Sequence, residues 1–96
     1  MLCRGERVTA DKLRKKVTGL NRALGRPEDG WTGIPGNLTA NVGHLYLDGS
    51  NGGYCLQQHV GEDGGATTLS DRMSAREMYH FLTGMEIFHG LRIGEL

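Results

Sequence analysis

The chain has 96 residues, of which 38% are hydrophobic, 23% charged and only 6% aromatic. Because domains commonly run to about 100–150 residues, we expect residues 1–96 to form one small domain, with residues 1–8 frayed. No apolar run is long enough to cross a membrane, and no apolar segment follows the charged N-terminus as in a secretory signal. Two cysteines, Cys3 and Cys55, are too few for a disulfide scaffold. The composition therefore predicts a cytoplasmic protein with free thiols.

The formal net charge is zero, but the charges are divided unevenly along the chain. Residues 1–26 carry eight basic and two acidic side chains (+6), whereas residues 27–96 carry three basic and nine acidic ones (−6). This division favours an anionic partner, or pairing of the two segments within the fold or across a dimer. The pI of 6.9 lies below the values above about 9 that are typical of nucleic-acid-binding domains.

Residues 9–24 have the pattern of an amphipathic helix. Thr9 is a suitable N-cap, and a glycine and a proline follow the helix. One narrow apolar stripe recurs at helical spacing, formed by Leu13, Val17, Leu20 and Leu24. The basic residues of this helix and its end are the candidate contacts to a protein partner or to nucleic acid: Lys12, Lys15, Lys16, Arg22 and Arg26.

Residues 26–43 contain two prolines and four glycines, which predict a loop. Trp31 is the only tryptophan of the chain. Two interpretations of it remain open: it covers the hydrophobic core, which we favour, or it contacts a ligand.

Residues 44–60 alternate between apolar and polar side chains on both sides of a turn rich in glycine and asparagine, which predicts a β-hairpin. The apolar face should meet the helices with Leu45, Leu47, Tyr54, Leu56 and Val60. The polar face carries His44 and His59, which can lie opposite each other and are candidate ligand contacts. A third strand or a sheet shared between two copies is expected, because a lone hairpin is marginally stable. Residues 61–71 have the composition of a second glycine-rich loop.

A second amphipathic helix is predicted over residues 75–83, ending at Gly84 or continuing toward Gly90. Ser74 and Glu77 have the spacing of a capping box, and Met73 and Met78 that of a hydrophobic staple. An apolar tail follows, which is expected to pack on the core or against a second copy: Ile87, Phe88, Leu91 and Ile93.

Searches for catalytic and metal-binding patterns give mostly negative results. The cysteines and histidines lack the spacing of a zinc motif, and no phosphate-binding loop occurs. We therefore predict no catalytic residue, no metal ligand and no cofactor. A small hydrolase or metal enzyme using His44, Cys55 and His59 is the third-ranked hypothesis.

The stretch from Gly52-Gly53-Tyr54 through the glycine loop to the helix Ser74-Ala75-Arg76-Glu77-Met78 resembles small phage and prophage proteins. The resemblance covers roughly residues 41–85. It implies an accessory protein in the cytoplasm of a bacterial host, and it implies no activity or cofactor.

The sequence thus predicts an α+β fold, in which an N-terminal helix, a central antiparallel hairpin or small sheet and a C-terminal capped helix pack on one face. The leading functional hypothesis is a non-enzymatic binding module, a homodimer that engages a protein partner. The alternative is nucleic-acid binding by the basic helix 9–24.

Overall fold

The computed structural model describes residues 7–49 and 52–94, with side chains through residue 90. The predictions for Cys3, for residues 1–6 and for the side chains of Leu91 and Ile93 lie outside the described part of the chain. The fold is α+β, with the element order α1 (Ala10–Ala23), β1 (Trp31–Ile34), β2 (Asn37–Ala40), β3 (Leu45–Asp48), β4 (Cys55–His59), β5 (Ala66–Thr68) and α2 (Ala75–Gly94).

Helix α1 confirms the predicted helix and its cap. The hydroxyl of Thr9 accepts a hydrogen bond of 3.2 Å from the backbone N–H of Lys12. The chain leaves the helix at Gly25, which has a φ of 70° that favours glycine. Three members of the apolar stripe are buried as expected, and Leu24 is partly buried against them. Val8, predicted to be frayed, packs against the same core.

Helix α2 starts as predicted and extends past both of its predicted ends, Gly84 and Gly90, to Gly94. The backbone N–H of Ser74 donates to the Glu77 carboxylate (2.9 Å), and the backbone N–H of Glu77 donates to the Ser74 hydroxyl (3.2 Å). The helix continues through Gly84 and Gly90. A glycine in a helix costs about 1 kcal/mol, which does not end a helix whose neighbouring residues pack. Met85, directly after Gly84, packs against the core.

The three-stranded sheet β3-β4-β5 supplies the other side of the core. Leu47 pairs with Leu56 in the antiparallel register of β3 and β4, so the core face of the hairpin is the predicted one. Val60 is the exception, because it follows the end of β4 and is half exposed. The core joins both helices to this sheet and consists of Leu13, Val17, Leu20, Leu45, Leu56, Met78 and Leu82.

Two predicted loops contain strands. Residues 26–43 were expected to form a loop, but β1 and β2 form an antiparallel hairpin that turns at Pro35 and Gly36. Proline followed by a glycine with φ of 87° is typical of a type II turn. Pro35 and Gly36, which contributed to the prediction of a loop, therefore form the turn of this hairpin. Likewise, β5 lies within the expected loop 61–71 and supplies the third strand by pairing with β4.

Asn21 of α1 is a buried polar residue that the periodicity did not reveal. Its side-chain N–H donates to the carbonyl of Leu45 (3.0 Å), and its side-chain oxygen accepts from the N–H of Leu45 (2.9 Å). The amide thus takes the place of a neighbouring strand at the edge of β3. This double contact fixes α1 against the sheet.

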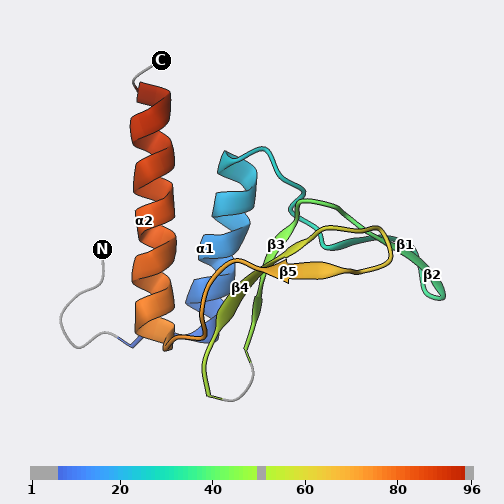
Figure 1. Ribbon diagram of the computed structural model, residues 1–96, viewed down its shortest axis with the longest axis horizontal. Helices are drawn as coiled ribbons and strands as arrows, with labels where there is room; N and C mark the ends of the chain where they lie inside the picture. Colours follow the sequence, from blue (N-terminus) through green and yellow to red (C-terminus); the bar gives the residue numbers. More distant parts are fainter. Residues whose placement is uncertain (1–6, 50–51, 95–96) are drawn as a thin grey trace.

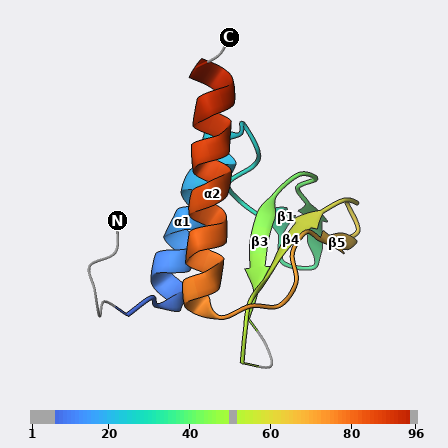
Figure 2. The same ribbon diagram turned by 60° about the vertical axis from the view of Figure 1, so that its left-hand side comes forward.

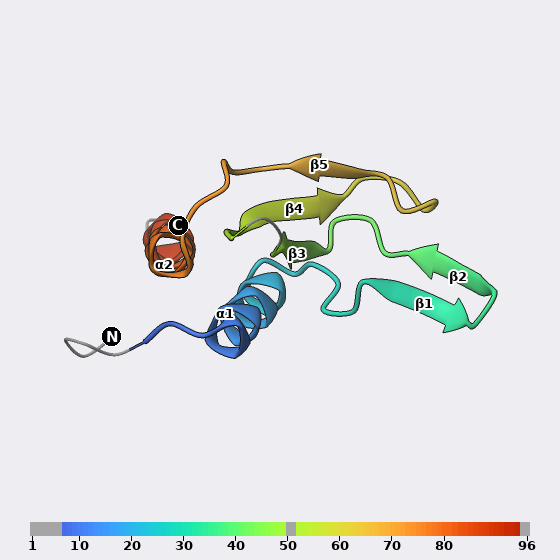
Figure 3. The same ribbon diagram turned by 90° about the horizontal axis from the view of Figure 1, so that it is seen from below.

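The views agree on the arrangement of the elements. Helix α2 runs beside α1 at one edge of the molecule, and the β1–β2 hairpin lies at the opposite end (Figure 1). Turning the molecule shows α2 standing in front of α1, with the strands to one side (Figure 2). Seen from below, the β3-β4-β5 sheet lies between α2 and the β1–β2 hairpin, and α1 lies beside β3 (Figure 3).

Candidate functional site

The basic residues predicted to contact a partner are partly engaged inside the fold. Lys16 lies 3.2 Å from the carboxylate of Glu86 and 4.4 Å from the centre of the Tyr79 ring. Arg22 forms an ion pair of 2.8 Å with Glu28, and the hydrogen bond from Arg22 lowers the pKa of that carboxyl. These contacts show that part of the basic segment pairs with the acidic remainder, one of the two outcomes that the charge division favoured.

The other three basic candidates make contacts of their own within the chain. Lys15 pairs with Asp11 on the exposed side of α1 at 3.2 Å. Lys12 donates to the carbonyl of Arg7, and Arg26 donates to the carbonyl of Gly43. The five residues are therefore spread over different contacts, and Lys15 is the most exposed of the ion-paired ones.

The outer flank of α2 carries large apolar side chains. Phe81 is 37% exposed, Ile87 59% and Phe88 62%. Gly84 lies between the two phenylalanines, and a Cβ placed there would meet no other atom within 4 Å. At helical spacing, residues 81, 84 and 88 fall along one stripe next to the buried Met78 and Leu82 face.

A groove with a volume of about 570 Å³ adjoins this stripe. Its lining residues are Thr68, Leu69, Ser70, Asp71, Met73 and Phe81. Leu69 is 43% exposed, so apolar surface continues from α2 onto the segment that precedes it. We call the stripe and the groove together the α2 surface.

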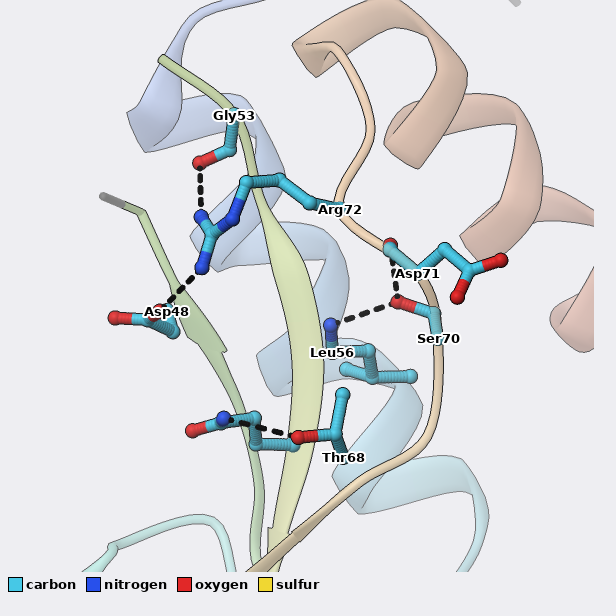
Figure 4. Close-up of polar contacts among 8 residues, drawn as sticks. Asp48, Gly53, Leu56, Thr68, Ser70, Asp71 and Arg72 are labelled. Carbon is cyan, nitrogen blue, oxygen red and sulfur yellow. Dashed lines mark hydrogen bonds and ion pairs between the residues drawn. The ribbon is translucent and has the colours of Figure 1, made fainter. Parts of the chain in front are cut away.

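The wall of the groove is held by backbone and polar contacts to β4 (Figure 4). The N–H of Leu56 donates to the hydroxyl of Ser70 at 2.9 Å, and that hydroxyl donates to the carbonyl of Asp71. Arg72 reaches across β4, donating to the carbonyl of Gly53 (3.1 Å) and pairing with Asp48 of β3 (2.9 Å). The segment before α2 is therefore a fixed wall of the groove.

A second site brings together the three residues predicted as ligand contacts. Trp31 lies 5.3 Å from His59 and His44 lies 5.6 Å from His59, measured between ring centres. Tyr46, which is not among the predicted ligand contacts, completes the group at 4.8 Å from His59. The period-two alternation of the sequence indicated this grouping, because His44, directly before β3, and Tyr46, within it, are two residues apart and share a face.

These rings line an open pocket of about 440 Å³ between the β1–β2 hairpin and the β3–β4 strands. We call it the histidine pocket, and its lining residues are Gly30, Trp31, His44, Tyr46, His59 and Gly64. The favoured interpretation of Trp31 as a cover on the core is wrong. Its side chain is 46% exposed, and it packs on Gly64 and His59 on the sheet face that points away from the helices.

On the polar face of the hairpin, His59 is only 5% exposed. Trp31 packs on His59 and accounts for this burial. Trp31 is held there by the β1–β2 hairpin, which was not predicted from the sequence. Cys55 is a buried free cysteine at the other end of β4. In the described part of the chain, no three histidine, cysteine or acidic side chains are placed to hold a metal ion together.

Over residues 7–49 and 52–94, neither helix combines the length and the apolar character needed to span a bilayer. Comparisons with protein-family models, with curated proteins and with solved structures find no match to this chain.

Proposed function

We propose that the protein is a homodimeric, non-enzymatic binding module whose dimer interface is the α2 surface. The observation that carries the proposal is the exposed stripe Phe81–Gly84–Phe88 beside the groove. Helix α2 lies at the edge of the molecule, with α1 and the sheet on one side of it (Figures 1 and 3). A helix with apolar residues around much of its circumference is typical of a helix buried on several sides.

The stripe has the spacing that a two-fold interface requires. In an isologous dimer the same patch is used twice, so it must be complementary to itself. Phe81 and Phe88 are seven residues apart, or about 10 Å along the helix. If two α2 helices cross antiparallel near Gly84, Phe88 of each copy reaches Phe81 and the adjoining groove of the other. The absence of a side chain at Gly84 lets the helices approach closely at the crossing point.

The size of the core also supports a second copy. Among the residues that the structure describes, seven buried side chains make up the cluster between the helices and the sheet. Small domains bury a modest share of their surface, and association contributes stability that the monomer lacks. Covering Phe81, Ile87 and Phe88 removes apolar area from water that the monomer leaves exposed.

In this proposal the dimer is a phage-type accessory protein that engages a protein partner in a bacterial host. Nucleic-acid binding by α1 is less well supported. Lys16 and Arg22 already form ion pairs within the chain, which reduces the charge that they offer to phosphates.

Sedimentation equilibrium over a wide concentration range tests the dimer. We expect a mass of twice 10.5 kDa for the wild type and of 10.5 kDa for the double variant Phe81→Ser with Phe88→Ser. The matched control is Ile34→Ser with Leu38→Ser, which removes two exposed apolar side chains from the distant β1–β2 hairpin and should leave the dimer intact. A wild type that is monomeric at all concentrations, or a control that dissociates as fully as the α2 variant, overturns the proposal. Circular dichroism shows that each variant keeps its helices.

A further inference from the structure

We propose that the histidine pocket binds an uncharged nucleobase-like heterocycle, a planar ring whose edge carries a hydrogen-bond donor next to an acceptor. The pocket lies between the β1–β2 hairpin and the β3–β4 strands. That hairpin lies away from α2 (Figure 3), so the inference is independent of the proposed dimer. Its volume of about 440 Å³ is within the range of small-molecule sites.

The hydrogen bonds of His44 fix which of its nitrogens offers a lone pair. Nδ1 of His44 lies 2.9 Å from the carbonyl oxygen of Pro27. Because a carbonyl oxygen only accepts, Nδ1 must carry the proton in this contact. In the neutral ring Nε2 is then an acceptor, and it lies on the side facing Gly30 in the pocket wall.

His59 supplies the complementary group. Its Nδ1 is the only fully buried side-chain nitrogen or oxygen without a hydrogen-bond partner in the described part of the chain. A buried N–H without an acceptor is rarer than an acceptor without a donor. The proton is therefore assigned to Nε2, which becomes a donor. His44 and His59, which both line the pocket, thus carry one acceptor and one donor on rings whose centres are 5.6 Å apart.

The walls of the pocket suit a flat ring. Trp31 and Tyr46 both contact His59 with their rings and present aromatic surface to the pocket. Two glycines complete the lining. A Cβ at Gly64 would lie 2.8 Å from the Trp31 ring, and one at Gly30 would lie 3.2 Å from the His44 ring. Because neither glycine has a side chain, the Trp31 ring packs directly on Gly64 and the His44 ring directly on Gly30. All four residues line the histidine pocket.

The charges near the pocket select against phosphate. No lysine or arginine lines it, whereas Glu62 and Asp63 directly precede Gly64 and Asp29 directly precedes Gly30. A phosphate group bound in the pocket would therefore have no cation among the lining residues to pair with. The free base or nucleoside is therefore the expected ligand, in preference to the nucleotide.

Trp31, as the only tryptophan, provides a direct readout through its fluorescence. The probes are adenosine, guanosine, cytidine and uridine, with ribose as the ligand control. We expect at least one nucleoside to change Trp31 emission saturably, and ribose to have no effect. His44→Phe and His59→Phe keep a ring but remove its polar atoms, so each should weaken binding about tenfold. His80→Phe, on the exposed side of α2, is the matched control and should bind as the wild type does.

The tautomers are measured separately on the wild type by two-bond ¹H–¹⁵N correlation spectra of the histidine rings, which needs no variant to fold. We expect the Nδ1–H form for His44 and the Nε2–H form for His59. Three results overturn the proposal: a His59 proton on Nδ1, no saturable response to any nucleoside at millimolar concentration, or undiminished binding in folded His44→Phe and His59→Phe proteins. A response to Zn²⁺ alone, with none to nucleosides, also overturns it.

Discussion

The strongest test of the fold is the substitution Asn21→Leu. Asn21 is 1% exposed, and its amide makes both hydrogen bonds available at the backbone of Leu45, which is itself 1% exposed. Leucine has nearly the shape of asparagine and keeps the site filled. It removes both partners of Leu45 without opening space for water, so the backbone N–H and carbonyl of Leu45 are left buried and unsatisfied.

The expected loss of stability follows from these two groups. An unsatisfied buried donor or acceptor costs about 1–3 kcal/mol, so the pair costs about 2–6 kcal/mol. Burial of the leucine side chain offsets about 1.5–3 kcal/mol of this loss. We therefore expect a net destabilisation of about 2 kcal/mol. That is a large share of the total, because domains have about 0.05–0.15 kcal/mol per residue, or about 5–14 kcal/mol for this length.

Urea unfolding followed by circular dichroism measures this loss as a lower midpoint with an unchanged slope. Hydrogen exchange adds a local readout, because the Leu45 amide should lose protection more than its neighbours. The matched control is Gln57→Leu, which removes a side-chain amide that makes a single exposed contact to Thr68 and should change stability by less than about 0.5 kcal/mol. Equal midpoints for wild type and Asn21→Leu, or an unaltered Leu45 exchange rate, would refute the reasoning.

Three further predictions concern the two glycine environments and the cap of α2. Gly19→Ala should stabilise the protein by about 0.5–1 kcal/mol, because Gly19 lies exposed within α1 with open space around the added methyl group; a lower thermal midpoint would contradict this. Gly33→Ala should destabilise the β1–β2 hairpin, because its φ of 124° disfavours alanine and the new Cβ would collide with the carbonyl oxygen of Asn37; unchanged amide exchange in β1 and β2 would show otherwise. The backbone N–H of Ser74 lowers the pKa of Glu77, so this carboxylate contributes stability above its unfolded pKa of about 4.3 that is lost as pH falls through the folded value. The thermal midpoint of Glu77→Gln should therefore fall less than that of the wild type below about pH 4.3, and parallel curves would exclude the coupling.

The elements with strong local signals could be predicted from the sequence. The spacing of Leu13, Val17 and Leu20 and the cap at Thr9 define α1, and Ser74 with Glu77 marks the start of α2. The end of α2 could not be predicted, because helix termination at Gly84 depends on whether the following residues find packing partners. Met85 finds one in the core.

Strands β1 and β2 could not be predicted for a different physical reason. In residues 31–40, small and polar residues interrupt the alternation that marks a half-buried strand, and nine of these ten residues are exposed. Only the turn at Pro35-Gly36 carried a local hairpin signal. Without β1 and β2, nothing in the sequence placed Trp31 beside His59. The grouping of Trp31 with the two histidines therefore depends on tertiary pairing that local periodicity does not encode.

The position of Trp31 has a consequence for how unfolding is observed. Its indole lies on the β1–β2 hairpin and packs on His59, and Trp31 is not a member of the core cluster that contains Leu13, Leu56 and Met78. The hairpin joins the rest of the chain through contacts at its base, including the bond from the N–H of Ala40 to the carbonyl of Glu62. Regions with few buried apolar contacts open at lower free energy than the core. Tryptophan emission therefore follows the opening of this hairpin, while far-ultraviolet circular dichroism follows the two helices. We expect the midpoint measured by tryptophan emission to lie at a lower denaturant concentration than the midpoint measured by circular dichroism. Such a difference means that the hairpin and the helical core unfold as two cooperative units.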